Sequence, residues 1–502
     1  MEAHQLVTNR LKGSNGIFDL SKISLFDICR YPMLNCCGST SCEYLCNICI
    51  NSPQGHRVIE KNKNLVFSVS ETSCHLCIYN EAKLTYHNII SDICNHINEI
   101  YILNLKHVFF RQKAILPLCD ALKHNTTVKV LDISGCLSSR ESKLSSICEL
   151  LTHNKTITSL NISSCGLNSD SVKRIVNSLI GNKSSAISDL NLSENFLFKK
   201  SCQSIIDLLI NYVQIRTLNL QRTFISHDDF DTFNPNGIVD IFNTISSCPW
   251  LTSLDIGENS FFRKDRQDVI NSVIYCLKHN QSLTHLNICG SHIGYHGMVN
   301  IANSLDSYNI SHLNISGNYD MKDAMHLLTE KMKNNKKITS LILNQCNLSK
   351  YIKDIADLIS TNTTIRILKL GSNVVVDSLD IKYLYHALEM NNNILTLDLS
   401  WVLSHYDAAK YIGKYILKNK TLKVLNIQHN GIDRNGMQYI SKCMRSNYSL
   451  IEMHYDIKYS ADRCDATYMR DIVNYIDRNS HNCNSKILSL LSYMCLYRSD
   501  IK

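Results

Sequence analysis

Apolar residues recur along the chain with one fixed spacing. The segment from Ile157 to Leu167 has apolar side chains at its first, fourth, sixth and eleventh positions. The same spacing starts again at Ile187, Ile215, Leu251, Leu283, Ile338, Ile365 and Leu422, and looser copies start at Ile100, Val128, Ile310, Ile394 and Leu450. These thirteen starts lie 27 to 36 residues apart. The pattern therefore predicts a protein built from repeats.

Each repeat carries a second apolar pattern after the first. The apolar positions within Ser169–Leu179 follow the three, one, three spacing of one helix face, and Arg434–Met444 has a similar face. Every repeat therefore predicts a strand, a turn, a helix and a turn. We also expect a helix over Tyr86–Ile97 before the first repeat, and closing helices over Ala466–Ile476 and Ile487–Leu496.

The first pattern has the order L-x-x-L-x-L-x-x-(N/C)-x-L, which resembles the leucine-rich repeat family. The long repeats resemble the class typified by ribonuclease inhibitor. This resemblance covers residues 100 to about 480 and implies an α/β leucine-rich repeat solenoid of about 13 repeats. The expected shape is a horseshoe with a parallel concave sheet and convex helices. We expect a Cys-rich N-terminal module and cap over 1–97, the repeat array over 98–480 and a C-terminal cap over 481–502.

Two Asn positions in the repeats are expected to be structural. The resemblance implies that the ninth position of the pattern points inward and binds backbone groups in the turn; it is Cys136, Cys165, Asn195, Asn259, Asn318, Cys346, Asn373 and Asn430. Helices are expected to end in Asn with Lys nearby, as at Lys123-His124-Asn125. Asn tolerates a left-handed cap, and Lys complements the negative end of the helix dipole.

Composition excludes several classes of protein. The 502 residues are 44% apolar and 19% charged, which does not fit a disordered chain or a coiled coil. No stretch reaches the ~18 apolar residues that span a bilayer. The start, Met1 to Gln5, lacks the basic-then-apolar pattern of a signal peptide. We therefore expect a cytoplasmic, reducing location in which the 22 Cys are mostly thiols.

The outward strand positions form the expected binding surface. The position between the two central apolar residues is mostly Asn or Asp, which could form an amide ladder along the sheet. Acidic residues outnumber basic ones on this face: Asp132, Asp189, Glu194, Asp255, Glu258, Asp398, Glu452 and Asp456 against Lys106, Arg222 and Lys369. Nucleic-acid binding rests on neutralising phosphates. Although the whole chain is +8, we expect a protein partner and neither nucleic acid nor a membrane.

Larger side chains in these columns are the candidate partner-binding residues: Glu194, Arg222, Glu258, His285, His312, Trp401 and His429. Trp401 has two interpretations, an exposed interface anchor or, because the turn of its repeat is shifted, a core side chain. Two longer repeats add Phe230, in the insertion Ser226–Gly237, and the pair Phe261 and Phe262. Exposed aromatics beside charges suit a protein contact, and a loop without function is the alternative.

Two Cys pairs suggest a metal site in the N-terminal module. Cys46 and Cys49, and Cys74 and Cys77, have the spacing of metal knuckles, and the segment between the pairs predicts a β-hairpin, as in a zinc ribbon. Four thiolates form a standard structural zinc site. The gap of 24 residues is longer than the usual ~15–20. Alternative ligands are Cys36, Cys37, Cys42 and His56. The alternative to a metal site is an irregular cap with buried Cys. No other cofactor is expected.

No enzyme motif stands out. The sequence lacks a Walker loop, a dinucleotide-binding glycine motif, His-Glu-x-x-His and Gly-x-Ser-x-Gly. We expect a non-enzymatic scaffold that binds a protein on the concave face and the long loops. The alternative is a GTPase-activating protein or a ubiquitin-ligase adaptor, although the end of the chain lacks an acidic tail and two Cys pairs are half of a ring-type series. A third hypothesis, for which the sequence holds no signal, is a pathogen effector.

Overall fold

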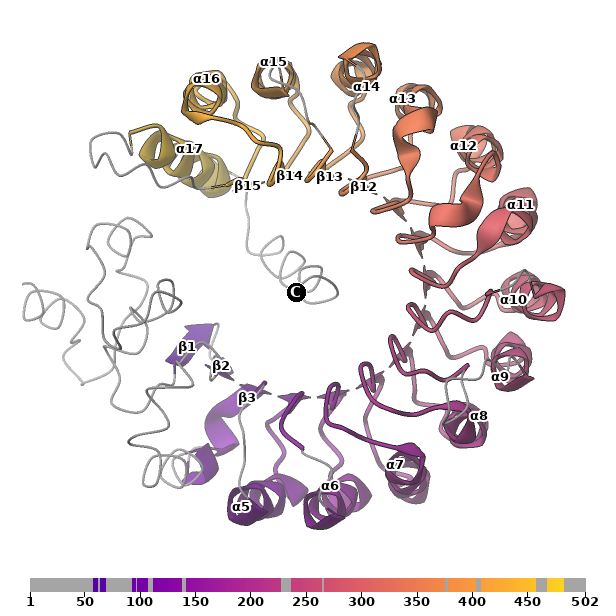
Figure 1. The fold of residues 1–502 in the computed structure, drawn as a ribbon. Coiled ribbons are helices and arrows are strands. Elements are labelled where there is room, and N and C mark those ends of the chain that lie inside the picture. Colours follow the sequence, from indigo (N-terminus) through magenta and orange to yellow (C-terminus); the bar gives the residue numbers. More distant parts are fainter. Residues whose placement is uncertain are drawn as a thin grey trace, which may run out of the picture. The chain divides into compact units, whose positions relative to one another are not determined.

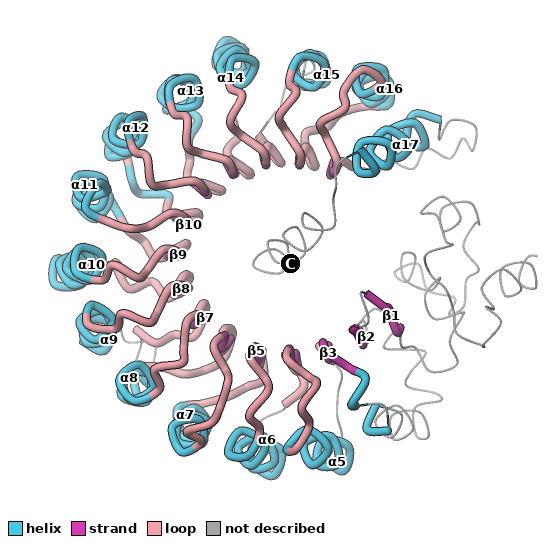
Figure 2. Tube along the Cα trace, turned by 180° about the vertical axis from the view of Figure 1, so that it is seen from behind, coloured by secondary structure: helices cyan, strands magenta, loops and turns pink. Residues whose placement is uncertain are grey.

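The computed structural model describes residues 57–61, 64–68, 93–95, 97–106, 112–137, 141–226, 236–263, 266–374, 378–402, 408–456 and 467–482. The chain divides into two units, unit 1 up to Asn259 and unit 2 from Ser260. In both units short strands alternate with helices along the chain (Figure 1). Seen from behind, the strands of each unit again form one layer and its helices the other (Figure 2).

Every predicted repeat contains its strand. Unit 1 holds β3 (Ile100–Asn104), β4 (Val130–Asp132), β5 (Ser159–Asn161), β6 (Asp189–Asn191), β7 (Thr217–Asn219) and β8 (Ser253–Asp255). Unit 2 holds β9 (His285–Asn287), β10 (His312–Asn314), β11 (Ser340–Ile342), β12 (Ile367–Lys369), β13 (Thr396–Asp398), β14 (Val424–Asn426) and β15 (Glu452–His454). Within each unit the neighbours pair in parallel, with Leu160 opposite Leu190 and Leu397 opposite Leu425. Equivalent positions of successive repeats therefore form columns.

A helix follows the strand of each repeat. Unit 1 holds α5 (Gln112–Lys123), α6 (Glu141–His153), α7 (Ser169–Gly181), α8 (Cys202–Asn211) and α9 (Asn236–Ser246). Unit 2 holds α10 (Gln267–His279), α11 (Gly294–Ser304), α12 (Ala324–Asn334), α13 (Ile352–Thr361), α14 (Ser378–Met390), α15 (Ala408–Lys418), α16 (Arg434–Met444) and α17 (Thr467–Asn482). Short 3-10 turns add η2 (Ile97–Glu99), η3 (Lys199–Ser201), η4 (Leu305–Ser307), η5 (Tyr319–Met321) and η6 (Leu348–Tyr351). The helices predicted over Ser169–Leu179 and Arg434–Met444 are confirmed.

The core lies between the strands and the helices. In the repeat that starts at Ile157, the four pattern residues are at most 3% exposed, and Val172, Ile175 and Leu179 of α7 close the other side. Burying one such side chain stabilises a fold by roughly 1.5–3 kcal/mol. In a single repeat the sides that face the neighbouring repeats would be open to water. The stabilisation from burial therefore depends on the neighbouring repeats.

The inward-pointing Asn of the turn is confirmed. Asn195 is fully buried and donates from Nδ2 to the carbonyls of Leu192 and Ile162, at 2.9 and 3.0 Å. Its Oδ1 accepts the backbone N–H groups of Cys165 and Leu167, each at 2.9 Å. Asn259, Asn318, Asn373 and Asn430 are bonded in the same manner. One side chain therefore links the turns of two neighbouring repeats.

The left-handed cap predicted for the Asn at helix ends is wrong. Asn362 has φ −76° and ψ 131°, and Asn182, Asn280 and Asn335 also have negative φ. The carboxamide of Asn362 instead donates to the carbonyl of Met332, one repeat earlier, at 2.8 Å. Its Oδ1 accepts the N–H of Ile365 at 2.9 Å. The role of these Asn is therefore to form hydrogen bonds between repeats, and their backbone is not left-handed.

The ends of the array are described in part. The predicted hairpin is confirmed, since β1 (Arg57–Lys61) and β2 (Asn64–Ser68) pair antiparallel, and β2 then pairs in parallel with β3. Only residues 93–95 and η2 of the predicted helix Tyr86–Ile97 lie among the described residues. The closing helix predicted over Ala466–Ile476 is α17, and Ile487–Leu496 lies outside the described residues. The three predicted segment boundaries stay predictions.

Candidate functional site

One column of turn residues has a left-handed backbone throughout. It lies seven positions after the first apolar residue of each repeat, and φ runs from 51° to 69° at every described member. We call it the turn column: Gly135, Ser164, Glu194, Arg222 and Glu258 in unit 1, and Gly290, Gly317, Gln345, Ser372, Trp401 and His429 in unit 2. This conformation favours glycine and costs other residues about 1–2 kcal/mol. Five of the seven candidate residues of the strand face belong to the turn column.

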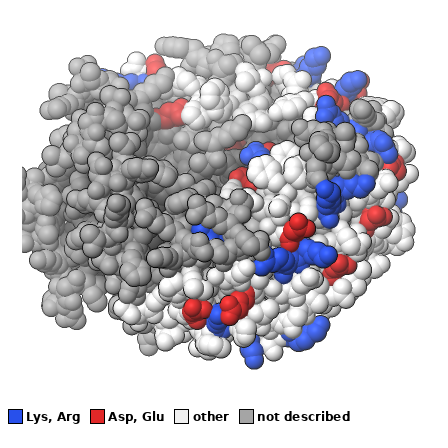
Figure 3. All heavy atoms as spheres, turned by 60° about the horizontal axis from the view of Figure 1, so that its bottom comes forward, with Lys and Arg blue, Asp and Glu red and all other residues white. Residues whose placement is uncertain are grey.

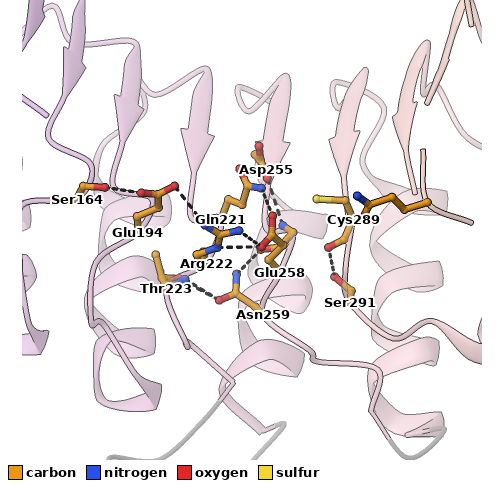
Figure 4. A network of polar contacts seen from close by, with 12 residues as sticks. Ser164, Glu194, Gln221, Arg222, Thr223, Asp255, Glu258, Asn259, Cys289 and Ser291 are labelled. Atoms are coloured by element: carbon orange, nitrogen blue, oxygen red, sulfur yellow. Dashed lines mark hydrogen bonds and ion pairs between the residues drawn. The ribbon is translucent and has the colours of Figure 1, made fainter. Parts of the chain in front are cut away.

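Three turn-column residues of unit 1 form a charged cluster (Figure 4). The Arg222 guanidinium donates to Glu258 Oε2 through Nε at 2.8 Å and through Nη2. On the other side, Arg222 Nη1 lies 3.7 Å from Glu194 Oε1. Gln221 donates to the second oxygen of Glu258 at 2.9 Å, and the Ser164 hydroxyl donates to Glu194. The parallel register places these side chains of four successive repeats side by side.

The charged cluster contributes little to the stability of the fold. The side chains of Arg222, Glu194 and Glu258 are 42%, 51% and 33% exposed. Ion pairs at that exposure contribute about 0–1 kcal/mol each. Their effect is to hold the guanidinium of Arg222 in one orientation at the surface.

Three aromatic residues beside the charged cluster were not predicted from the sequence. Phe196 stacks on Phe224 with ring centroids 6.1 Å apart, and Phe198 lies 6.4 and 5.9 Å from the two rings. Phe196 is 54% exposed, and the other two are half-buried. Phe196 and Phe224 each follow a turn-column residue by two positions, where the repeat pattern accepts any side chain. The available signal was a large apolar residue at that unconstrained position in two successive repeats.

Trp401 lies at the surface, so its core interpretation is wrong. It is 53% exposed, and its ring stacks on that of His429 with centroids 4.7 Å apart. His429 is held by Asp456, whose Oδ2 accepts the backbone N–H of His429 at 2.6 Å and whose Oδ1 lies 3.5 Å from Nδ1. Trp401, His429 and Asp456 therefore form a single surface group on three neighbouring repeats of unit 2.

The two remaining His candidates also lie together. His285 and His312 are register partners on β9 and β10, and their rings stack with centroids 3.8 Å apart. The Nδ1 atoms lie 2.9 Å from the Thr284 hydroxyl and 2.8 Å from the Ser311 hydroxyl, respectively. Both rings are half-buried. The neighbouring hydroxyls fix the orientation of the pair.

The predicted amide ladder is mostly replaced by bonds within each repeat. Asn191 Oδ1 accepts the N–H of Ser193 at 3.0 Å, which closes a turn just after the strand, and Asn219 and Asn314 do the same with the residue two positions on. The ladder bond is seen between Asn161 and Asp132, at 3.0 Å. Of the acidic residues expected on this face, Asp132 and Asp255 are only 8% exposed.

The prediction that Phe261 and Phe262 are exposed is wrong. Both side chains are completely buried, with ring centroids 4.6 Å apart. Phe261 is the eleventh residue of the repeat that starts at Leu251, so it fills the last apolar position of the pattern. Phe230 and the four predicted zinc ligands, Cys46, Cys49, Cys74 and Cys77, lie outside the described residues.

Metal-binding clusters and reactive thiols were sought among the described residues. These residues contain no group of three or more His, Cys, Asp or Glu placed to hold a metal ion. Burial raises the pKa of the thiols of Cys119, Cys202 and Cys346 to about 12, so these Cys are not nucleophiles at neutral pH. Within the same part of the chain, no helix has the length and apolar character needed to cross a membrane.

The arrangement defines a class of protein, an α/β solenoid that presents columns of side chains on a sheet. A leucine-rich repeat family model matches residues 153–176, 279–302 and 418–441. Each match begins four residues before a predicted repeat start, at Ile157, Leu283 and Leu422. The family model and the apolar pattern therefore share one register. The chain is a leucine-rich repeat protein, and the ribonuclease-inhibitor-like class stays a prediction.

Several solved structures are similar in fold. "Leiomodin-1 Actin-Binding Site 2 (ABS2)" is 19% identical, with 33% of this chain and 95% of that chain covered and a TM-score of 0.28. A chain of the yeast Rad7 and Elc1 complex is 12% identical, with coverage of 77% and 93% and a TM-score of 0.47. The leucine-rich repeat-containing protein LegL7 from Legionella pneumophila is 18% identical, with coverage of 67% and 96% and a TM-score of 0.42. These similarities carry no functional argument. No curated protein matches the sequence.

The backbone of the turn column can be tested at Glu194. Replacing Glu194 with glycine removes the left-handed penalty together with weak surface ion pairs, so the free energy of unfolding should change by less than about 1 kcal/mol. Glu194→Val should destabilise the protein by roughly 1–2 kcal/mol, because a β-branched residue fits this conformation worst. Urea unfolding followed by circular dichroism measures both. Equal stability of the two variants would contradict the left-handed assignment.

Proposed function

We propose that the protein is a non-enzymatic scaffold that binds a protein partner. In unit 1 the binding surface consists of Glu194, Arg222, Glu258 and the adjacent rings Phe196 and Phe224. The observation that carries the proposal is the presence of large side chains in the turn column, where Gly135 shows that the fold needs no side chain. Strained backbone positions with exposed side chains are concentrated at functional sites.

The composition of this surface supports a protein partner. An oriented Arg beside exposed aromatic rings is the combination that contributes most binding energy in protein interfaces. The two carboxylates hold the Arg222 side chain at 2.8 and 3.7 Å, so little of its conformational freedom is left to lose on binding. A nucleic acid is disfavoured because one Arg stands between two Glu.

The described outer surface carries charges of both signs (Figure 3). In the view of Figure 3, acidic and basic side chains lie next to each other rather than in patches of one sign. Lys123 of α5, for example, lies 2.6 Å from Glu149 of α6 and 2.8 Å from Asp120. Such mixed charge is typical of a solvated helical surface.

The proposal includes a cytoplasmic location and no catalytic activity. Thiols buried as small apolar groups, as at Cys119 and Cys346, suit a reducing compartment. The alternative function, a ubiquitin-ligase adaptor, depends on the Cys-rich N-terminal segment. Zinc binding by the Cys pairs of that segment stays a prediction, which metal analysis of the full chain can test.

The test is site-specific photo-crosslinking in cells. A benzoylphenylalanine replaces Phe196, and in a matched control it replaces Lys173, an exposed residue of α7. We expect crosslinked protein at position 196 that is absent at position 173 and is lost when Arg222→Gly is added. If both positions yield the same crosslinks, or if Arg222→Gly leaves those at 196 unchanged, this surface is not the binding site.

A further inference from the structure

A second exposed aromatic group, in unit 2, has a different electrostatic setting from the first. It is the Trp401–His429 pair on the face formed by β13, β14 and β15. The outward residues of these strands and of the turns that follow are Thr396, Asp398, Ser400 and Trp401; Val424, Asn426, Gln428 and His429; and Glu452, His454 and Asp456. They include three carboxylates and neither Lys nor Arg. We call them the acidic aromatic face.

The side chain of Trp401 is only partly covered. The His429 ring stacks on the Trp401 ring, with a centroid distance of 4.7 Å and an interplanar angle of 26°. The preceding turn-column residue is Ser372, a small side chain. About half of the Trp401 surface therefore stays exposed, 53% of the residue.

The carboxylates of the acidic aromatic face lie on β13, on β15 and in the turn after β15. Asp456 lies beside the His429 ring, and Glu452 pairs with His454 at 2.8 Å on the same strand. Asp398 Oδ1 accepts the N–H of Ser400 at 2.9 Å. Two Lys border the face: Lys369 of β12 is the register partner of Asp398, and Lys423 directly precedes β14. The acidic aromatic face therefore carries three carboxylates, with Lys369 and Lys423 beside it.

We infer that the acidic aromatic face binds a basic segment of a protein partner, with an Arg or Lys of that segment over the Trp401 indole. The inference rests on the proposed scaffold function and adds the chemistry of a partner. Trp is the best aromatic partner for a cation, and a carboxylate close to the ring adds to the attraction. An acidic or purely apolar segment would have to approach three carboxylates without compensation.

The spacing of the strands indicates an extended peptide rather than a single cation. Neighbouring strands lie about 4.8 Å apart, so Asp398 on β13 and Asp456 after β15 are about 10 Å apart in the direction across the sheet. An extended peptide advances about 3.3 Å per residue. Basic residues two or three positions apart would therefore meet Trp401 and the outer carboxylate together.

The test uses the full chain and the labelled peptide (Arg-Gly)₆, with (Glu-Gly)₆ as the charge-reversed probe. Binding is followed by fluorescence anisotropy, and the emission of Trp401 is followed in a Trp250→Phe background, which leaves Trp401 as the single Trp. We expect (Arg-Gly)₆ to bind, to perturb Trp401 emission and to weaken with added salt, while (Glu-Gly)₆ does not bind.

Variants then locate the contact. Trp401→Ala should weaken (Arg-Gly)₆ binding by about 3- to 30-fold, and Asp456→Asn should weaken it and reduce its salt dependence. The matched control is Asp357→Asn, which makes the same charge change at a 66% exposed side chain of α13 on the helical side. Circular dichroism checks that each variant is folded, and Trp401→Phe, which keeps a ring, should retain part of the affinity.

Three outcomes would overturn the inference: no binding of (Arg-Gly)₆, equal binding of (Glu-Gly)₆, or an effect of Asp357→Asn as large as that of Asp456→Asn. The proposed scaffold function fails separately. Its crosslinks at Phe196 lie in unit 1, and their presence or absence does not depend on Trp401.

Discussion

Replacing Asn195 with alanine is expected to destabilise unit 1 by about 3–5 kcal/mol, a large effect for the substitution of one polar side chain. The variant leaves the N–H groups of Cys165 and Leu167 without the Oδ1 acceptor, 2.9 Å away in the native structure. It also removes the donor to Ile162 and Leu192. Each buried group left unsatisfied costs about 1–3 kcal/mol, and water cannot reach a residue with no exposed surface.

Two further substitutions show whether the loss of stability is specific to the buried position of Asn195 or follows from removing an Asn at other positions. Asn191→Ala, in the same repeat, removes a half-exposed side chain that accepts one bond, from Ser193. It should cost about 1 kcal/mol or less. Asn195→Cys should lie between the two, because Cys165 fills the same position one repeat earlier and donates to Ile133 at 3.4 Å.

The measurement is urea unfolding by circular dichroism together with amide hydrogen exchange of the neighbouring repeats. Because stability in a solenoid is roughly additive over repeats and their interfaces, exchange should increase on both sides of Asn195. If Asn195→Ala and Asn191→Ala had equal effects, the side chain would not be the link between turns that the geometry indicates.

The repeat register could be predicted from the sequence because one physical requirement recurs in every repeat. Leu160, Leu190 and Leu218 must each face the core and pair in register, so a single misplaced apolar residue would have conflicted with its neighbours. The turn Asn followed from the same logic, since a buried turn must satisfy its backbone groups. The strands and the inward Asn are therefore where sequence and structure agree.

The candidate site could be predicted only in part. Glu194, Arg222, Glu258, Trp401 and His429 stand out by size against small neighbours, which was enough to place them in one column. Their left-handed backbone was not predicted, although Gly135, Gly290 and Gly317 in the same column were a signal for it. Contacts between repeats, such as Arg222 with Glu258 or Trp401 with His429, depend on side-chain rotamers that the apolar pattern does not constrain.

The aromatic residues show how a local interpretation can fail. The charged residues that follow Phe261 and Phe262, from Arg263 to Arg266, suggest an exposed loop. Their position in the repeat was the better guide, because the eleventh residue of a repeat is buried at Leu167 and Leu197 as well. Phe196 was missed for the opposite reason, because its neighbour Leu197 satisfies the pattern and leaves Phe196 without a structural role.

Phe261→Ala is therefore expected to act on stability and Phe196→Ala on binding. Truncating a completely buried Phe costs about 3–5 kcal/mol, through lost burial and the cavity that remains, and the Phe262 ring 4.6 Å away loses a packing partner. Phe196→Ala removes a 54% exposed ring and should change the free energy of unfolding by about 1 kcal/mol or less.

The two variants are compared by urea unfolding and by capture of the protein that crosslinks at the unit 1 surface, with the crosslinker moved to position 194. Phe261→Ala should lower the urea midpoint, and at temperatures where it stays folded it should capture as much as the native protein. Phe196→Ala should keep the midpoint and lose capture. The reverse result would contradict both assignments. Loss of capture in Phe261→Ala would mean that Phe261 contacts the partner, which a side chain without exposed area cannot do. A lower midpoint for Phe196→Ala would mean that Phe196 supports the core, to which an exposed ring contributes little.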